Sequence, residues 1–294
     1  MARTSSNSTF GRKVMKRLRY HFFEGYDRAR WWAWRKHWVG QPWVEVNGSR
    51  MKVELNDPGI SRELALYQTH EPIATDLAVK FAADCRTVVD LGSNVGYYAL
   101  LFLTHINPRP KLISIEPSMD NIRRLKANLE ANGLLESATI IRTAISDHCG
   151  EGQLNLARES NWHSLLPADE RHSGSESVSV TTLDALLDQL GLTQVDLVRM
   201  DIEGYESVVL GGMYATLNKS KPKLIIELHP QLIGTMPVLD LIDKLQSKHG
   251  YRILHVVDRE YDYAHMSTMA VEIDPERLLK ENLDRRCFTV FMAP

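Results

Sequence analysis

The sequence predicts an α/β fold built on a parallel sheet of the nucleotide-binding type. A strand, a loop with two glycines and a helix follow one another over residues 87–103. Later apolar runs of strand length alternate with helical segments, and acidic residues stand at their ends. Such units build parallel sheets, which bind ligands outside the carboxyl ends of their strands. We therefore expect the acidic residues to gather at a ligand-binding edge of the sheet.

The N-terminal segment, residues 1–43, is basic and rich in Trp. Residues 1–38 hold ten Lys and Arg against two acidic residues, a net charge of +8; because the whole chain carries −2, the rest carries −10. Apolar residues recur at every fourth position from Val14 to Tyr26, which predicts a helix with one apolar face. Five Trp residues follow: Trp31, Trp32, Trp34, Trp38 and Trp43.

Basic residues beside clustered Trp are typical of a helix that lies in a lipid headgroup layer. Alternatively, the apolar face packs on the main domain and the charges are solvated. Nucleic acid is an unlikely partner, because the acidic remainder would repel phosphate. No apolar run approaches the roughly 18 residues that cross a bilayer, and no secretory signal is evident. We expect a cytoplasmic protein, with peripheral contact of residues 1–43 to the inner membrane face as an added hypothesis.

Three elements are predicted before the glycine loop. Asn47 and Gly48, between two short apolar runs, predict a β-hairpin over residues 44–55. Residues 60–67 and 71–83 are predicted to be helical. We place the boundary of the main domain at the hairpin, so that a single domain spans residues 44–294.

The glycine loop after the strand of residues 87–91 contains Gly92, Ser93, Asn94 and Gly96. The two glycines are four positions apart and no third follows, so the loop lacks the G-x-G-x-x-G pattern that binds a dinucleotide pyrophosphate. Asn94 suits a left-handed backbone within the loop. The pattern favours a different nucleotide cofactor.

Asp90 lies at the carboxyl end of the same strand, where a carboxylate suits a cationic group. The α-amine of S-adenosylmethionine is such a group. The alternative is a structural turn in which Asp90 caps the helix.

Two further strands complete the predicted cofactor site. The strand of residues 112–115 ends in Glu116, 24 positions after Gly92, where a carboxylate can accept both hydroxyls of an adenosine ribose. The strand of residues 138–141 is followed by Ala144, where the adenine would lie. This last segment could equally be an ordinary loop.

Residues 150–180 change to short alternating strands around a polar segment with Asn161, Trp162 and Ser164. An inserted hairpin of this kind can shape an acceptor pocket, in which Trp162 offers a flat apolar face to a sugar ring or a lipid. A surface loop is the alternative.

Carboxylates and an imidazole follow the next two strands. The strand of residues 195–200 leads into Asp201, Glu203 and Glu206, and that of residues 224–228 leads into His229. Methyl transfer from a sulfonium needs in-line placement and a base for the proton of the acceptor. We predict Asp201 or His229 as the base, with Glu203 and Glu206 as orienting groups; a cap or a satisfied core group is the alternative for either base.

Magnesium bound by Asp201, Glu203 and Glu206 is a further alternative. One strand end supplies most of these ligands, and we expect no metal.

The last predicted elements are a helix over residues 237–245, a strand over residues 252–257 and a terminal strand over residues 287–292. Residues 258–283 are charged and long enough for a functional loop or an added helix.

In these motifs the sequence resembles the FkbM family of S-adenosylmethionine-dependent methyltransferases. The resemblance spans roughly residues 71–257 and is most specific in the block DIEGYE. It is carried by DLGSNVGYYAL (90–100), IEP (115–117), AISD (144–147), VTTLD (180–184), VDLVRMDIEGYE (195–206) and IIELHP (225–230).

The resemblance implies a class I methyltransferase, Rossmann-like fold: a seven-stranded, mostly parallel sheet with helices on both faces. It also implies O-methylation, commonly of sugar hydroxyls. The cofactor residues that it implies are Asp90, Gly92, Asn94, Gly96 and Glu116. Asp201, Glu203 and Glu206 would line the reaction centre, and Asn161 and Ser164 resemble a polar segment near it.

The leading hypothesis is an O-methyltransferase of a glycan hydroxyl. A cofactor-binding adaptor without catalysis, acting at a membrane or on a partner through residues 1–43, is the second. A methyltransferase of lipids, small molecules or nucleic acids is the third.

Overall fold

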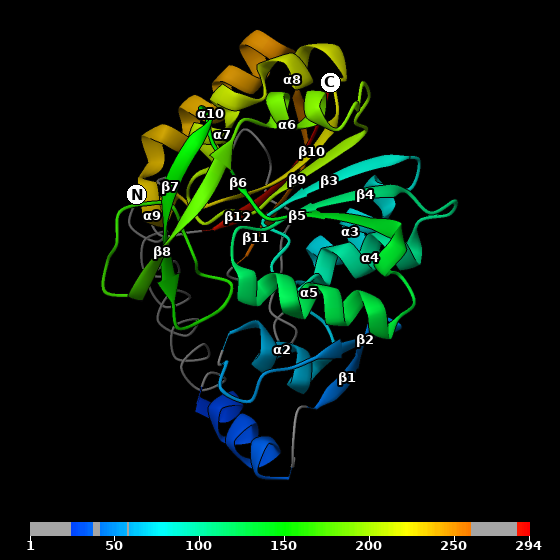
Figure 1. Cartoon of the computed structure of the whole chain (residues 1–294), viewed down its shortest axis with the longest axis vertical. Coiled ribbons are helices and arrows are strands. Elements are labelled where there is room, and N and C mark those ends of the chain that lie inside the picture. Colours follow the sequence, from blue (N-terminus) through cyan, green and yellow to red (C-terminus); the bar gives the residue numbers. More distant parts are fainter. Residues whose placement is uncertain (1–24, 38–41, 58, 260–286) are drawn as a thin grey trace, which may run out of the picture.

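The computed structural model describes residues 25–37, 42–57, 59–259 and 287–294. A seven-stranded sheet with strand order β11-β12-β10-β9-β3-β4-β5 forms the centre (Figure 1). Its strands are β3 Thr87–Leu91, β4 Lys111–Ile115, β5 Ala138–Ile141, β9 Leu197–Met200, β10 Lys223–Leu228, β11 Arg252–Asp258 and β12 Phe288–Ala293. β3, β4, β5, β9 and β10 run parallel, and β12 is antiparallel to both β10 and β11. The expected mostly parallel sheet is confirmed.

Helices cover both faces of the sheet (Figure 1). One face carries α2 Ile60–Tyr67, α3 Pro72–Phe81, α4 Tyr97–His105 and α5 Met119–Ala131. The other carries α6 Leu183–Gln189, α7 Glu206–Val209, α8 Tyr214–Lys219 and α10 Thr235–His249. The structure also has the short helix α9, Pro230–Ile233, and the 3-10 turns η1 Leu135–Ser137 and η2 Leu210–Gly212.

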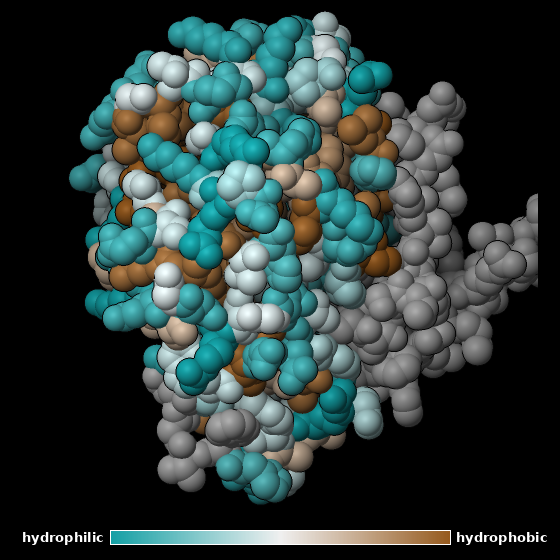
Figure 2. Space-filling view, turned by 90° about the vertical axis from the view of Figure 1, so that its right-hand side faces the viewer, coloured by the Kyte–Doolittle hydropathy of each residue, from teal (hydrophilic) through white to brown (hydrophobic). Residues whose placement is uncertain are grey.

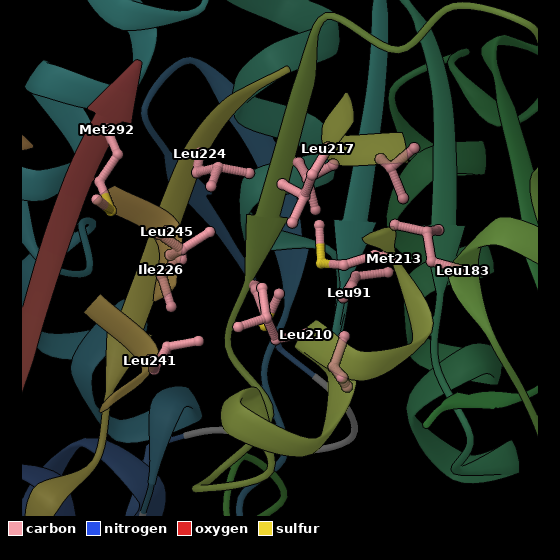
Figure 3. Packing of buried hydrophobic residues seen from close by; sticks show 14 of the residues in the cluster. Leu91, Leu183, Leu210, Met213, Leu217, Leu224, Ile226, Leu241, Leu245 and Met292 are labelled. Carbon is pink, nitrogen blue, oxygen red and sulfur yellow. The ribbon is translucent and has the colours of Figure 1, made fainter. Parts of the chain in front are cut away.

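The sheet is buried on both faces because its strands are apolar at nearly every position. In β3, Val88 packs against the α4 side and Val89 against the α6 side, as the two-residue period of a strand requires. Figure 3 shows the second of these clusters, in which Leu91 lies near Met213 and Leu210. On the face in Figure 2, polar side chains cover most of the surface, with smaller apolar areas between them.

A second, three-stranded sheet has the order β6-β8-β7. Its strands are β6 Ala144–Ile145, β7 Gly150–Ala157 and β8 His172–Thr181. The long β7 and β8 form the expected inserted hairpin. Ala144 is not in a loop, because β6 pairs in parallel with Val180 and Thr181 of β8. This pairing anchors the insertion next to the end of β5.

The expected hairpin consists of β1, Trp43–Val46, and β2, Ser49–Lys52. Asn47 and Gly48 both adopt positive φ, 47° and 77°, as a tight two-residue hairpin turn requires. The buried Asn128 of α5 joins the hairpin to the main domain: its Oδ1 accepts from the backbone N–H of Lys52 and its Nδ2 donates to Val95 O, both at 2.8 Å. The hairpin is therefore part of the core packing.

Residues 25–36 are helical, and the earlier part of the helix predicted from Val14 lies outside the described residues. Trp31 is buried and stacks on Trp34, whereas Trp32 is 60% exposed. One Trp of the cluster thus packs inward and another remains at the surface, and Tyr26 of the predicted apolar face is also exposed. No helix in the described ranges combines the length and apolar character needed to cross a membrane. The predicted excursion of residues 258–283 lies almost entirely outside the described part.

We expect Asn128→Ala to lower the free energy of unfolding by about 2 kcal/mol, because it leaves a buried carbonyl and a partly buried N–H unpaired. Asn132→Ala is the matched control, since Asn132 bonds Arg50 of the same hairpin at a more exposed position; we expect it to cost about 1 kcal/mol or less. Urea unfolding of both variants measures the difference. Equal losses would show that the buried bond does not anchor the hairpin.

Candidate active site

Two adjoining cavities open at the carboxyl ends of β3, β4, β9 and β10. The first is lined by Glu116 and Ala144 among others, and the second by Trp162 and His229 among others. Five predicted site residues line both cavities: Gly92, Asn94, Asn161, Asp201 and Glu203. The sequence thus located the junction of the two cavities.

The other predicted residues divide between the cavities and the layer behind them. Ser164 lines the first cavity, and Ser93 lines the second. Asp90, Gly96 and Glu206 line neither. They lie one layer further from the open space, where they support the residues that line it.

Backbone conformation and close packing shape the glycine loop. Gly92, Asn94 and Gly96 have φ of 78°, 48° and 91°, the left-handed values that glycine and asparagine tolerate best. A Cβ on Gly92 would lie 2.0 Å from the backbone oxygen of Asp201, and one on Gly96 would lie 2.5 Å from Leu125 Cδ1. Gly92 therefore lets β3 and β9 approach at the site, whereas Gly96 serves packing against α5.

Glu116 is a buried carboxylate that ties the loop to the end of β4. It accepts hydrogen bonds from the backbone N–H groups of Asn94 and Ser118, both at 2.9 Å, and from Asn121 Nδ2 at 3.3 Å. Burial raises the pKa of Glu116 to about 7, although these hydrogen bonds lower it. A carboxylate that faces the first cavity and is half ionised near neutral pH is poised to accept hydrogen bonds from a ligand.

Arg199, within β9, connects two of the predicted residues. Its guanidinium donates to Asp90 Oδ1 and Gly92 O, both at 3.2 Å, and to Asp201 Oδ2 at 2.7 Å, and it lies 4.2 Å from the centre of the Tyr98 ring. Burial raises the pKa of Asp90 even though Arg199 opposes this. Asp90 thus contacts Arg199, and its role toward a cofactor amine stays a prediction.

His229 lies at the centre of a group of carboxylates. Its Nδ1 is 2.9 Å from Glu206 Oε1, which also accepts from the backbone N–H of Gly204. Its Nε2 is 3.9, 3.7 and 3.8 Å from carboxylate oxygens of Asp201, Glu203 and Glu227. The side chains come from the loop after β9, from the start of α7, from the end of β10 and from the residue that precedes α9.

Burial and like charge determine protonation in this group. Burial and the charge of Glu227 raise the pKa of Asp201 to about 7, and burial raises that of Glu203 to about 8. Burial alone would lower the pKa of His229, but Cys287, Glu203 and Glu206 outweigh it and raise this pKa well above the ordinary value. Both carboxylates therefore hold a proton more readily than ordinary carboxylates do, and their charges favour the protonated form of His229.

The far wall of the second cavity is an ion network that the sequence reasoning did not find. Glu71, which is 1% exposed and has φ of 46°, accepts from Tyr98 Oη at 3.0 Å and pairs with Arg259 at 2.7 Å and with His70 at 2.6 Å. Arg259 also contacts Glu227 at 2.9 Å. These residues come from four distant segments, and no short motif signals their meeting.

The inserted hairpin closes the cavities from one side. Ser164 donates its hydroxyl to the backbone oxygen of Glu203 at 2.9 Å, and Trp162 is 38% exposed beside the second cavity. Asn161 Oδ1 is buried without a hydrogen bond among the described residues. The polar segment therefore lines the cavities, and its role in binding an acceptor stays a prediction.

Comparisons with known proteins place the chain in a family. Residues 90–253 match the model described as the methyltransferase FkbM domain. The 2-O-methyltransferase NoeI of Sinorhizobium fredii is 28% identical over 177 residues, which cover 54% of this chain and 71% of NoeI. AmbE of Pseudomonas aeruginosa, an AMB antimetabolite synthetase, is 24% identical over 203 residues, 56% of this chain but 9% of AmbE.

Solved structures share the fold at low identity. A structure from Streptococcus mutans, named as a putative S-adenosylmethionine-dependent methyltransferase, aligns with a TM-score of 0.50 and 11% identity over 87% of this chain and 56% of that one. Methyltransferase FkbM from Methylobacillus flagellatus aligns with a TM-score of 0.45 and 17% identity over 70% of this chain and 44% of that one.

The first cavity fits the adenosine part of S-adenosylmethionine. Glu116 offers a buried carboxylate there, and Asn94 Oδ1 and Asn161 Oδ1 are buried acceptors without hydrogen bonds among the described residues. A ligand with hydroxyl and amino groups would satisfy them. The family model covers more than half of the sequence, so this protein belongs to the FkbM family of methyltransferases, whose methyl donor is S-adenosylmethionine.

Proposed function

We propose that this protein transfers the methyl group of S-adenosylmethionine to a hydroxyl of a sugar in a glycan or polysaccharide. The observation that carries the proposal is the junction of the two cavities. The first fits adenosine against Glu116, and the second holds carboxylates beside an exposed Trp; Asp201 and Glu203 line both. A donor in the first cavity and an acceptor in the second would therefore meet at these carboxylates.

The residues of the first cavity bind the donor, which supplies an electrophilic methyl group on its sulfonium. Glu116 would accept hydrogen bonds from the ribose hydroxyls, and Ala144 would contact the adenine. The segment of Gly92, Ser93 and Asn94 borders the methionine part. Gly92 is required because any side chain there would meet the backbone of Asp201.

The second cavity binds the acceptor. The exposed face of Trp162 suits the apolar face of a sugar ring, and the polar walls suit its hydroxyls. NoeI is named a 2-O-methyltransferase, which supports an oxygen atom as the acceptor. A sugar is favoured over a lipid chain, because charged side chains surround the cavity.

The carboxylate pair of Asp201 and Glu203 takes the proton from the acceptor hydroxyl. The new oxygen-methyl bond forms as the methyl-sulfur bond breaks, and the sulfonium becomes a neutral thioether. Groups with pKa near the working pH are the best bases, and those of Asp201 and Glu203 are about 7 and about 8. His229 was predicted as an alternative base; because its surroundings keep it protonated, we assign it an electrostatic role.

The proposed location is the cytoplasm, with residues 1–43 in peripheral contact with the inner membrane face. In the described part of this segment, Arg30 lies over the ring of exposed Tyr26, and Lys36 lies over the ring of exposed Trp32. Aromatic and basic side chains together favour an anionic headgroup layer. Such a position would bring the enzyme to lipid-linked sugars.

Asp201→Asn should reduce methyl transfer at least a hundredfold, because it removes a carboxylate from the pair while it keeps the shape of the side chain. The measurement is transfer of labelled methyl from S-adenosylmethionine into fractionated host glycans, lipids, nucleic acids and proteins. Asp120→Asn, an exposed acid on α5, is the control and should retain full activity.

Label in the glycan fraction that Asp201→Asn abolishes would support the proposal. Label confined to lipids, small molecules or nucleic acids would overturn the sugar acceptor. Cofactor binding with no label in any fraction would favour an adaptor instead.

Adenosine should bind about tenfold more tightly at pH 8 than at pH 6, because a carboxylate with a pKa of about 7 is mostly protonated at the lower pH. The ribose hydroxyls stabilise its ionised form. Calorimetry from pH 6 to pH 8 measures the affinity for adenosine, with Glu116→Gln as the comparison. The variant should bind adenosine weakly and without this pH dependence. Adenosine is the probe because it lacks the methionine part that borders Asp201. An unchanged pH dependence in the variant would remove Glu116 from the ribose site.

Full-length protein should sediment with phosphatidylcholine vesicles that contain phosphatidylserine, and Trp32→Ser should weaken this binding several-fold, since it removes an exposed aromatic anchor. Tyr214→Ser changes an exposed aromatic of α8 and should have no effect. Equal binding by all three proteins, or none by the wild type, would argue against membrane contact through this segment.

A further inference from the structure

Asp201, Glu203 and His229 each turn a metal-ligating atom toward one point. These atoms all lie within 4.8 Å of one another. His229 Nε2 is 3.9 Å from Asp201 Oδ1 and 3.7 Å from Glu203 Oε2. Donors bound to one cation at about 2.1 Å lie roughly 3 to 4.2 Å apart. Both distances to His229 Nε2 fall in this range, and the two carboxylate oxygens lie within 4.8 Å of each other.

His229 is held so that its Nε2 faces this point. The side chain is 3% exposed, and Nδ1 lies 2.9 Å from Glu206 Oε1, which the backbone N–H of Gly204 fixes in turn. Nε2 faces three carboxylates, none of them within hydrogen-bond distance. A carboxylate behind an imidazole is the usual arrangement of a metal-binding His. It explains why Glu206 is buried away from both cavities.

The two carboxylates also have oriented oxygens. Oδ2 of Asp201 accepts a hydrogen bond from Arg199 at 2.7 Å, and Oδ1 faces His229. The backbone of Glu203 is fixed by Ser164, and its carboxylate makes no hydrogen bond within the described residues. One oxygen of each side chain is therefore available to a cation.

A second group, Glu227, His229 and Cys287, is a weaker candidate. Glu227 Oε1 already accepts from Arg259 at 2.9 Å and from the Cys287 thiol at 3.0 Å. The guanidinium would repel a cation there. The open side of His229 toward Asp201 and Glu203 is the better position.

We propose that Asp201, Glu203 and His229 bind a divalent cation, which takes the place of the proton on His229 Nε2 and coordinates the hydroxyl oxygen of the acceptor. Two carboxylates and one imidazole suit Mn²⁺ or Mg²⁺, and the coordination positions that remain can take two neighbouring hydroxyls of a sugar. The role in catalysis rests on the proposed methyl transfer, whereas binding of the cation can be tested without it. This reverses the expectation that the site holds no metal, and it replaces Glu206 by His229 among the ligands considered.

The cation would lower the pKa of the bound hydroxyl, and the proton would pass to the oxygen of Glu203 that is not a ligand. The other oxygen of Asp201, Oδ2, would still accept the hydrogen bond from Arg199. The two carboxylates thus divide the work: Asp201 holds the cation in place, and Glu203 both binds it and takes the proton.

The test is Mn²⁺ binding by full-length protein freed of metal with a chelator, followed through the electron paramagnetic resonance signal of free Mn²⁺. We expect one site in the wild type. Asp201→Asn and His229→Gln should weaken binding at least tenfold, and Glu206→Gln, which acts through His229, by about tenfold. Asp120→Asn should bind as the wild type does. Adenosine binding shows that each variant is folded.

Absence of Mn²⁺ binding by protein that binds adenosine, or equal binding by wild type and the Asp201 and His229 variants, would overturn the site. Methyl transfer that continues in excess chelator would overturn its catalytic role and leave the proposed function intact. Loss of transfer in chelator, restored by Mn²⁺ or Mg²⁺, would support that role.

Discussion

The buried guanidinium of Arg199 is the interaction on which the arrangement of the site depends. It joins Asp90 at the end of β3, the carbonyl of Gly92 in the loop and Asp201 after β9, and it lies on the ring of Tyr98 from α4. Removing one partner of such a group leaves a buried charge without compensation, which is far more costly than the net worth of the pair. Arg199 therefore ties together the groups at the ends of the two strands where Gly92 and Asp201 meet, and it sets the direction of the Asp201 carboxylate.

On either side of Arg199, one group of residues is suited to bind the donor and another is suited to the reaction. Glu116 and the glycine loop form a preorganised wall for the donor, since the carboxylate already accepts two backbone N–H groups. The acidic group at His229 lies across the junction, where burial and repulsion raise the carboxylate pKa values. The Glu71 and Arg259 network closes the other side. An acceptor would thus enter a cavity whose charged groups are nearly all held by partners behind them.

Much of the fold could be predicted because its signals are local. Apolar runs predicted the parallel strands, and the Asn47-Gly48 pair predicted the hairpin. Gly92, Asp201 and His229 each follow the end of a parallel strand. Because the carboxyl ends of parallel strands lie at one edge of the sheet, the sequence predicted that these residues meet. Arg199 was missed although a lone Arg in an apolar strand is a signal, since its partners depend on strand register. The protonation of His229 and the network at Glu71 depend on distant segments, and Ala144 pairs with β8, far along the chain.

The central claim is that the donor and the acceptor meet at Asp201 and Glu203. A crystal structure of the protein with S-adenosylhomocysteine tests this most directly. We expect ribose hydroxyls within hydrogen-bond distance of Glu116, adenine beside Ala144, and the sulfur at the junction of the cavities, facing Asp201 and Glu203. Density for the ligand in another cavity, or a sulfur turned away from the carboxylates toward solvent, would contradict it.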